Sequence, residues 1–282
     1  MIKTIPYTIK AKNKELRNPK QKIPYTIIQT MKTNKVPIDM YNAAMSWVEK
    51  NPEYDYEFFD NERCEQFLKD NYPPTIYHCF NMIYIGAAKA DLFRWAVLNI
   101  KGGVYLDIDC QAIMPIRNFI KEDDQFVTRT SDIMGFKFRI NHALFASIPN
   151  FILLSKSIDN AISNILIRYN QKRDEYLPQD ICGPAVLGKT LNILKKRPIK
   201  QFHNKYKNNI VNLNFVKIRL LPKEQLIKYL IPKYKNYLSD CEKNNFERYH
   251  KEKSAFYYSY ANEYVIKNNV KLDFSLINGV FV

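Results

Sequence analysis

The sequence of 282 residues lacks most of the motifs that mark specialised protein classes. Its five cysteines are odd in number and scattered, and none forms a Cys-X-X-Cys pair. This pattern predicts neither a zinc site nor a disulfide framework. Neither Gly-X-Gly-X-X-Gly nor a Walker A loop occurs among the 7 glycines. Their absence argues against a dinucleotide cofactor and against a P-loop ATPase.

Long apolar segments are also missing. No stretch approaches 18 apolar residues, so we expect no transmembrane helix. Residues 1–16 are interrupted by Lys3, Lys10, Lys12 and Lys14 and lack the apolar centre of a signal peptide. We therefore expect a soluble, cytoplasmic protein, located in the host cytoplasm or the virion if the source is a virus.

The charge is strongly positive, and it is concentrated late in the chain. The formal net charge is +15, and residues 195–253 hold 16 Lys and Arg against 5 Asp and Glu, with aromatic residues between them. Such a segment could bind an anionic membrane surface or an acidic polymer, or it could be an ordinary lysine-rich surface. We do not favour nucleic acid, because no helix-turn-helix, zinc-finger or RNA-recognition signature occurs.

Hydrophobic periodicity predicts an α/β fold. The hydrophobic content of 46% is sufficient for a large core. Predicted strands alternate with predicted helices, which is typical of a sheet with helices on both faces. The predicted strands are 23–29, 54–59, 104–109, 125–130, 134–138, 143–146 and 211–221. The predicted helices are 40–50, 62–70, 85–100, 151–169 and 185–196.

The most informative stretch is Tyr105–Asp109, which follows Gly102-Gly103. Apolar residues alternate there with Tyr105, Asp107 and Asp109, so a strand would carry the two carboxylates on one face, roughly 6–7 Å apart. Two such carboxylates repel each other unless a cation or a proton lies between them. Closely spaced oxygen ligands suit Mg²⁺ or Mn²⁺. The simpler interpretation is an amphipathic strand with solvated aspartates.

The preceding segment, 85–100, is a dense helix-forming run that should end at a glycine C-cap. Asp91 and Arg94 are three residues apart and share one face of this largely apolar helix. They could form an internal ion pair, or both could point into a polar site at the end of the following strand.

Residues 88–109 resemble the Asp-X-Asp signature of the glycosyltransferases of family 32. Relatives include yeast-type initiating mannosyltransferases, bacterial capsule enzymes and the glucosylating domains of clostridial toxins. The family pattern has an Asp, an Arg three residues later, a Gly-Gly pair and then Tyr-X-Asp-X-Asp. The matching positions here are Asp91, Arg94, Gly102, Gly103, Tyr105, Asp107 and Asp109.

Weaker matches lie on either side of this segment. Residues 23–33 resemble the family's opening strand and keep Gln29 and Thr30, but Met31 stands where a Trp is common. An aromatic residue there could stack on the nucleotide base, so base recognition at this position is in doubt. Asn141 lies in a segment similar to the family's Asn-containing strand. His250 is the only trace of a C-terminal His-plus-Trp element.

The resemblance implies a fold of the GT-A type, with a Rossmann-like nucleotide half, a mixed central sheet and flanking helices. We expect a loosely held extension at 1–20, a catalytic core at 21–196 and a basic, aromatic-rich part at 197–282 that completes the fold. The implied activity is retaining transfer of a hexose from a nucleotide-sugar to a glycan, protein or other hydroxyl acceptor. UDP-sugars are the first expectation for the donor and GDP-mannose the second.

The resemblance also implies roles for individual residues. Asp109 would bind Mn²⁺ or Mg²⁺ directly, with Asp107 and the more distant His250 as further candidates. Asp91 and Arg94 would hold the donor sugar, and Tyr105 would flank the nucleotide. We count Gln29, Thr30, Asp107 and Asn141 as additional donor-binding candidates, and Asp91, Arg94, Asp107 and Asp109 as the catalytic set.

Two other classes remain open at this stage. A metal-dependent nuclease or phosphotransferase would use Asp107 and Asp109 to hold one or two ions, and it would need a further carboxylate cluster. A basic nucleic-acid-binding protein with an inactive transferase core would instead bind through 195–253, with strong dependence on salt.

Overall fold

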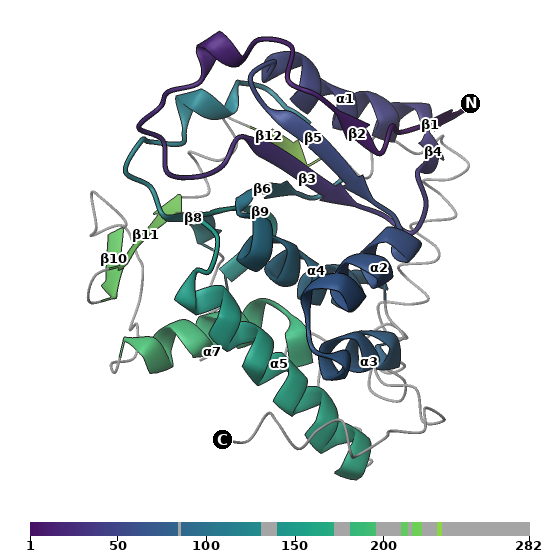
Figure 1. Cartoon of the computed structure of the whole chain (residues 1–282), viewed down its shortest axis with the longest axis vertical. Coiled ribbons are helices and arrows are strands. Elements are labelled where there is room, and N and C mark those ends of the chain that lie inside the picture. The colour runs from purple at the N-terminus through teal and green to yellow at the C-terminus, as the bar shows by residue number, and fades with distance from the viewer. Residues whose placement is uncertain are drawn as a thin grey trace.

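The computed structural model describes residues 1–83, 86–130, 140–171, 181–195, 210–213, 216–221 and 230–232. Within these ranges an eight-stranded mixed sheet forms the centre of the fold (Figure 1). β3 pairs in parallel with both β5 and β6, and β11 pairs in parallel with β8, whereas the other neighbours are antiparallel. The strand order is β10 (Ile210–Leu213), β11 (Val216–Leu221), β8 (Phe126–Thr130), β9 (Ile140–Ser147), β6 (Gly103–Leu106), β3 (Thr26–Thr30), β5 (Asp55–Phe59) and β2 (Thr8–Ile9).

Helices cover both faces of this sheet, as predicted. On one face lies α1 (Ile38–Lys50), together with the pairs β1 (Ile2–Thr4) with β4 (Lys35–Pro37) and β7 (Cys110–Ala112) with β12 (Leu230–Pro232) (Figure 1). The opposite face carries α2 (Asn61–Asn71), α3 (Pro74–Met82), α4 (Gly86–Lys101), α5 (Ile152–Gln171) and α7 (Pro184–Leu194). The predicted α/β class, with a mixed central sheet between helices, is confirmed. No helix in the described ranges is long and apolar enough to cross a membrane.

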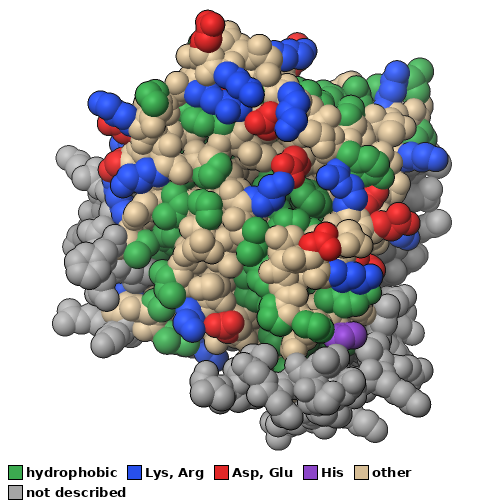
Figure 2. Space-filling view, viewed as in Figure 1, with side chains coloured by type: hydrophobic (Ala, Val, Ile, Leu, Met, Phe, Trp, Pro, Cys, Tyr) green, Lys and Arg blue, Asp and Glu red, His purple; other side chains and the backbone are tan. Residues whose placement is uncertain are grey.

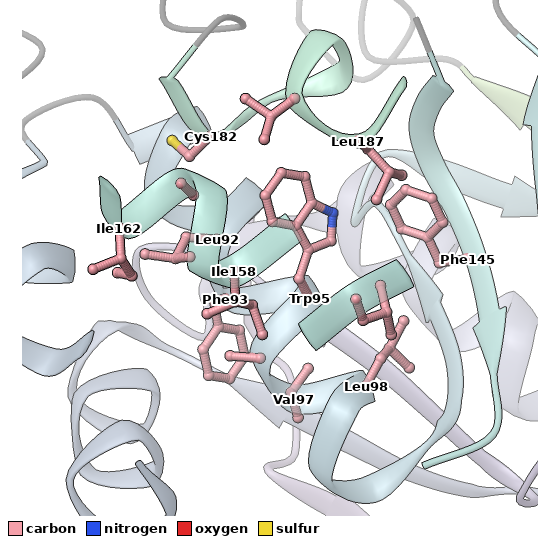
Figure 3. Close-up of a cluster of buried hydrophobic side chains, with 14 of the residues drawn as sticks. Leu92, Phe93, Trp95, Val97, Leu98, Phe145, Ile158, Ile162, Cys182 and Leu187 are labelled. Carbon is pink, nitrogen blue, oxygen red and sulfur yellow. The ribbon is translucent and has the colours of Figure 1, made fainter. Parts of the chain in front are cut away.

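A large hydrophobic core lies between the sheet and the five-helix layer. The side chains of α4 are buried on nearly all sides, as its apolar sequence predicts. Figure 3 shows the indole of Trp95 enclosed by side chains from neighbouring elements, among them Phe145 of β9, Ile158 of α5 and Leu187 of α7. This core holds α4 rigidly against the sheet, which fixes the position of any polar side chain that α4 carries.

The strand β6 is shorter than predicted, and both of its faces are buried. Tyr105 packs into the core beneath the five helices, whereas Val104 and Leu106 belong to a second core beneath α1. Burial on both faces is usual for a central strand with parallel pairing. The strand ends at Leu106, and Asp107 begins a turn in which its carbonyl accepts a hydrogen bond from the Cys110 N–H at 3.0 Å. The prediction that both aspartates extend one polar strand face is therefore wrong.

The two glycines between α4 and β6 have the conformation that the C-cap prediction requires. Gly102 has φ of 63°, and its N–H donates to the Leu98 carbonyl at 2.8 Å. Gly103 has φ of 103°, and a Cβ added there would lie 2.6 Å from the backbone oxygen of Thr26. Glycine is needed because any side chain would push β6 away from β3.

Two parts of the prediction differ from the structure. A further helix, α3, follows the predicted helix at 62–70, and Pro74 is its first residue, where its fixed φ and missing N–H suit a helix start. The predicted strand at 211–221 is a hairpin of β10 and β11. The predicted strand at 134–138 lies outside the described residues.

The first residues of the chain are part of the fold rather than a loosely held extension. β2 pairs antiparallel with β5, and Ile5 is fully buried. Arg17 donates a hydrogen bond to the Glu53 carbonyl at 2.8 Å and forms an ion pair with Asp55 at 3.1 Å. Because this segment is rich in lysine, its sequence did not indicate that it pairs with the sheet.

Candidate active site

The topology brings several chain segments to one edge of the sheet. β3 pairs in parallel with β5 on one side and with β6 on the other. Ligands of open α/β sheets commonly bind at the carboxyl ends of the strands at such a switch point. β9 runs antiparallel to β6, which places its first residues at the carboxyl end of β6. α4 enters β6 through the glycine pair, and its earlier turns lie at this same edge.

Arg94 is the centre of the polar cluster at this edge. Its side chain is almost fully buried, with Nη2 3.1 Å from Asp91 Oδ1 and Nη1 3.0 Å from Asp107 Oδ1. The guanidinium also donates to the backbone carbonyl of His142 and lies over the ring of Tyr105, 4.6 Å from its centroid. Both interpretations of the Asp91–Arg94 spacing are therefore correct, because the pair forms and also reaches the Asp-X-Asp turn.

The surroundings of the turn raise the pKa of both of its carboxyl groups. Burial, together with repulsion from Asp109 and Asp91, raises the pKa of Asp107 to about 6, although Arg94 opposes the rise. Burial also raises the pKa of Asp109 above its ordinary value. A bound cation would relieve both effects.

The two carboxylates of the turn are the candidate ligands for a divalent ion. Asp107 and Asp109 are half-buried carboxylates, and only Oδ1 of Asp107 is engaged by Arg94. No group of three or more His, Cys, Asp and Glu side chains gathers within the described ranges. Mg²⁺ and ions of similar size are often held by one or two carboxylates plus substrate phosphates. The two aspartates fit that mode of binding, while the other candidate ligand, His250, lies outside the described residues.

The segment around this cluster matches a known family. Residues 37–127 fit the model described as a glycosyltransferase sugar-binding region containing a DXD motif. This segment is therefore similar to that glycosyltransferase family. The match contains Asp91, Arg94, Asp107 and Asp109, so the family resemblance seen in the sequence is confirmed.

Several known proteins are similar to parts of this chain. An uncharacterized glycosyltransferase of Acanthamoeba polyphaga mimivirus is 28% identical over 138 residues, which are 46% of this chain and 54% of the relative. Inositol phosphoceramide mannosyltransferase 2 of Schizosaccharomyces pombe is 36% identical over 87 residues, 31% of this chain and 25% of the relative. The chain thus spans a quarter to about half of these two proteins. The solved structure of PaToxG Glycosyltransferase superposes with a TM-score of 0.49 and 17% identity over 61% of this chain and 70% of that one.

Gln29 of β3 holds the DXD turn through a hydrogen bond to its backbone. Gln29 is fully buried, and its Nε2 donates to the Asp107 carbonyl at 3.3 Å, while its Oε1 accepts from the Tyr56 hydroxyl at 2.9 Å. Both ends of the amide are therefore used inside the protein, and its predicted contact with the donor is not supported. Thr30 likewise donates to the Phe59 carbonyl at 2.7 Å.

A second support of the DXD turn comes from α1. The Trp47 indole N–H donates to the Cys110 carbonyl at 2.6 Å, and the Ser46 hydroxyl accepts from the Ala112 N–H at 2.9 Å. These bonds clamp β7, which follows Asp109 directly. The turn that carries the two aspartates is thus held from β3 on one side and from α1 on the other.

Sequence reasoning missed His142, which also lies at this polar cluster. His142 is the third residue of β9, and its Nδ1 lies 2.7 Å from Asp91 Oδ1. Burial lowers the pKa of His142 although the Asp91 carboxylate opposes the shift. No sequence pattern pointed to it, because its contact with α4 depends on the pairing of β9 with β6. Asn141, the residue before it, lies on β9 at the same edge, where its donor contact stays a prediction.

Proposed function

We propose that this protein is a metal-dependent, retaining glycosyltransferase. It would move a hexose from a nucleotide-sugar to a hydroxyl group of a glycan, a protein or another acceptor. The observation that carries the proposal is the Arg94 bridge, which joins Asp91 on α4 to Asp107 in the DXD turn within the family segment. The buried guanidinium of Arg94 thereby links the residue expected to hold the sugar with a residue expected to hold the metal ion.

Charge is the basis of the proposed reaction. Departure of the nucleoside diphosphate leaves negative charge on the leaving oxygen, and a divalent ion held by Asp107 and Asp109 would neutralise it as a Lewis acid. Asp91 and Arg94 would position the sugar through its hydroxyl groups. The anomeric carbon would pass through an oxocarbenium-like state. We propose that the acceptor attacks from the face that the diphosphate leaves, which retains the anomeric configuration.

The names of the relatives refine the choice of donor. Several are called mannosyltransferases, among them inositol phosphoceramide mannosyltransferase 2 and an initiation-specific α-1,6-mannosyltransferase of Candida albicans. We therefore place GDP-mannose ahead of the UDP-sugars that the sequence alone favoured. The acceptor of this chain is open among glycan, protein and lipid hydroxyl groups.

The basic segment at 195–253 stays a prediction as a partner-binding surface, because most of it lies outside the described residues. On the face shown in Figure 2, Lys and Arg side chains of the described residues lie among Asp and Glu. We therefore propose no acidic polymer or membrane as a ligand of the described part of that face.

The test is release of nucleotide by the purified chain from GDP-mannose, UDP-glucose and other UDP-sugars. We expect release from one donor, dependence on Mn²⁺ and loss with EDTA. Asp109→Asn keeps the shape of the side chain but removes its charge, and it should lower the rate at least about 100-fold. Asp159→Asn is the matched control, since Asp159 is exposed on α5 and pairs with Lys156.

Two results would count against the proposal. Nucleotide release that survives both EDTA and Asp109→Asn would separate the activity from the DXD turn. Cleavage of DNA or RNA under the same conditions, with no donor turned over, would favour a nuclease instead.

A further inference from the structure

His142 is a polar residue in a buried, largely aromatic surrounding, where an unpaired ring nitrogen lowers stability. The residue is 6% exposed, and its ring packs edge-on against Trp95 at 5.4 Å and tilted against Phe145 at 5.1 Å between ring centroids. Its Nε2 is buried and has no hydrogen-bond partner among the described residues. A buried polar atom without a partner is destabilising. A phenylalanine would suit this aromatic surrounding better if stability were the only requirement.

The other ring nitrogen has a single, specific contact. Nδ1 lies 2.7 Å from Asp91 Oδ1, the same oxygen that Arg94 Nη2 approaches at 3.1 Å. A neutral ring, which burial favours, would donate its Nδ1 hydrogen to that carboxylate. The hydrogen bond with His142 and the ion pair with Arg94 both fall on Oδ1, and together they set the rotation of the Asp91 carboxylate. Within the described part of the chain, no donor contacts the second oxygen, Oδ2.

The backbone of His142 strengthens the arrangement. Its carbonyl accepts a hydrogen bond from Arg94, whose Nη1 also contacts Asp107. His142 therefore contacts the polar cluster twice, once through its ring on Asp91 and once through its carbonyl on Arg94. The antiparallel pairing of β9 with β6 fixes the backbone on which both contacts depend.

We propose that His142 is a positioning residue that holds the Asp91 carboxylate with Oδ1 turned inward and Oδ2 presented to the donor sugar. The inference rests on the proposed function, because it assigns Asp91 to the sugar rather than to the nucleotide. It explains why a polar ring is kept in an apolar surrounding: the hydrogen bond to Asp91 serves binding at the expense of stability.

The test compares the binding of a nucleotide-sugar with that of its nucleoside diphosphate, by calorimetry with Mn²⁺ present. The probes are GDP-mannose against GDP and UDP-glucose against UDP, using whichever pair the unaltered protein binds. In His142→Phe we expect the nucleotide-sugar to bind about tenfold or more weakly, as for loss of a hydrogen bond to a charged group. Binding of the diphosphate alone should change less than about twofold, and the melting temperature should stay the same or rise.

A second variant makes the test robust to a folding defect. The amide of His142→Asn can donate to Asp91 in place of Nδ1, so this variant should recover most of the lost affinity. Asp91→Asn should cost less affinity for the nucleotide-sugar in the His142→Phe background than in the unaltered protein, because His142 acts through the Asp91 carboxylate.

The possible failures can be told apart. Equal losses for the nucleotide-sugar and the diphosphate, or no loss for either, would overturn the role of His142. Weak binding in His142→Asn equal to that in His142→Phe would overturn it as well. If the unaltered protein binds neither pair, the proposed function itself fails.

Discussion

Replacement of Gly103 by alanine should destabilise the protein strongly and also disturb the DXD turn. Gly103 begins β6, and its missing side chain allows that strand to approach β3. Any retreat of β6 would lengthen the hydrogen bond from Gln29 to the Asp107 carbonyl, which is already 3.3 Å long. Stability and metal binding should therefore decline together in Gly103→Ala.

The size of the effect has two sources. The first is the φ of 103°, a region where a side chain costs about 1–3 kcal/mol. The second is the contact of 2.6 Å that the new Cβ would make with the Thr26 backbone oxygen. Backbone in a sheet moves less readily than a flexible side chain, so we add roughly 1–3 kcal/mol for overpacking. Together they give an expected loss of about 2–6 kcal/mol, a large share of the roughly 5–15 kcal/mol that a typical protein has.

Urea unfolding followed by circular dichroism measures the loss. Gly86→Ala is the matched control, because Gly86 is the first residue of α4 and a Cβ added there meets nothing within 4 Å. That variant should unfold within about 0.5 kcal/mol of the unaltered protein, as is usual for changes away from packed positions. A loss below about 1 kcal/mol in Gly103→Ala would refute the close approach of β6 and β3.

Two further predictions concern the metal ion. Tyr56→Phe removes the hydrogen bond that orients Gln29 and should weaken Mn²⁺ binding about fivefold, measured by electron paramagnetic resonance, given about 1 kcal/mol for one hydrogen bond. Tyr54→Phe is the control and should leave Mn²⁺ affinity unchanged, because Tyr54 bonds Gln21 instead. The pKa of about 6 at Asp107 means that protons compete with the ion in acid, so Mn²⁺ affinity should fall as the pH drops below 6. An affinity that stays constant from pH 7 to pH 5 would contradict that assignment.

The part of the site that the sequence predicted is local in the chain. Asp91, Arg94 and Asp107 lie in one helix–Gly-Gly–strand unit, so helix periodicity and a glycine C-cap were enough to bring them near one another. His142 could not be found in this way, since 48 positions separate it from Arg94 and only the pairing of β9 with β6 joins them. Gln29 was expected to contact the donor, and only the burial of β3 shows that it supports the turn instead.

The errors in the fold have similar physical causes. The alternation through Asp109 looks like a strand, but the burial of β6 on both faces ends it where the polar residues begin. The start of α3 was hidden because a proline pair marks the beginning of a helix as readily as the end of one. These choices depend on packing partners that are distant in the sequence.

The short strand β2 has a consequence for handling the protein. It covers part of the outer edge of β5 with only two residues, Thr8 and Ile9, and Lys10 follows it directly. Short edge strands bordered by lysine discourage a sheet from pairing with strands of other molecules. Trimming residues 1–20 as a dispensable basic tail would expose β5 as an open edge, and self-association of the shortened chain would then mask whatever activity the site retains.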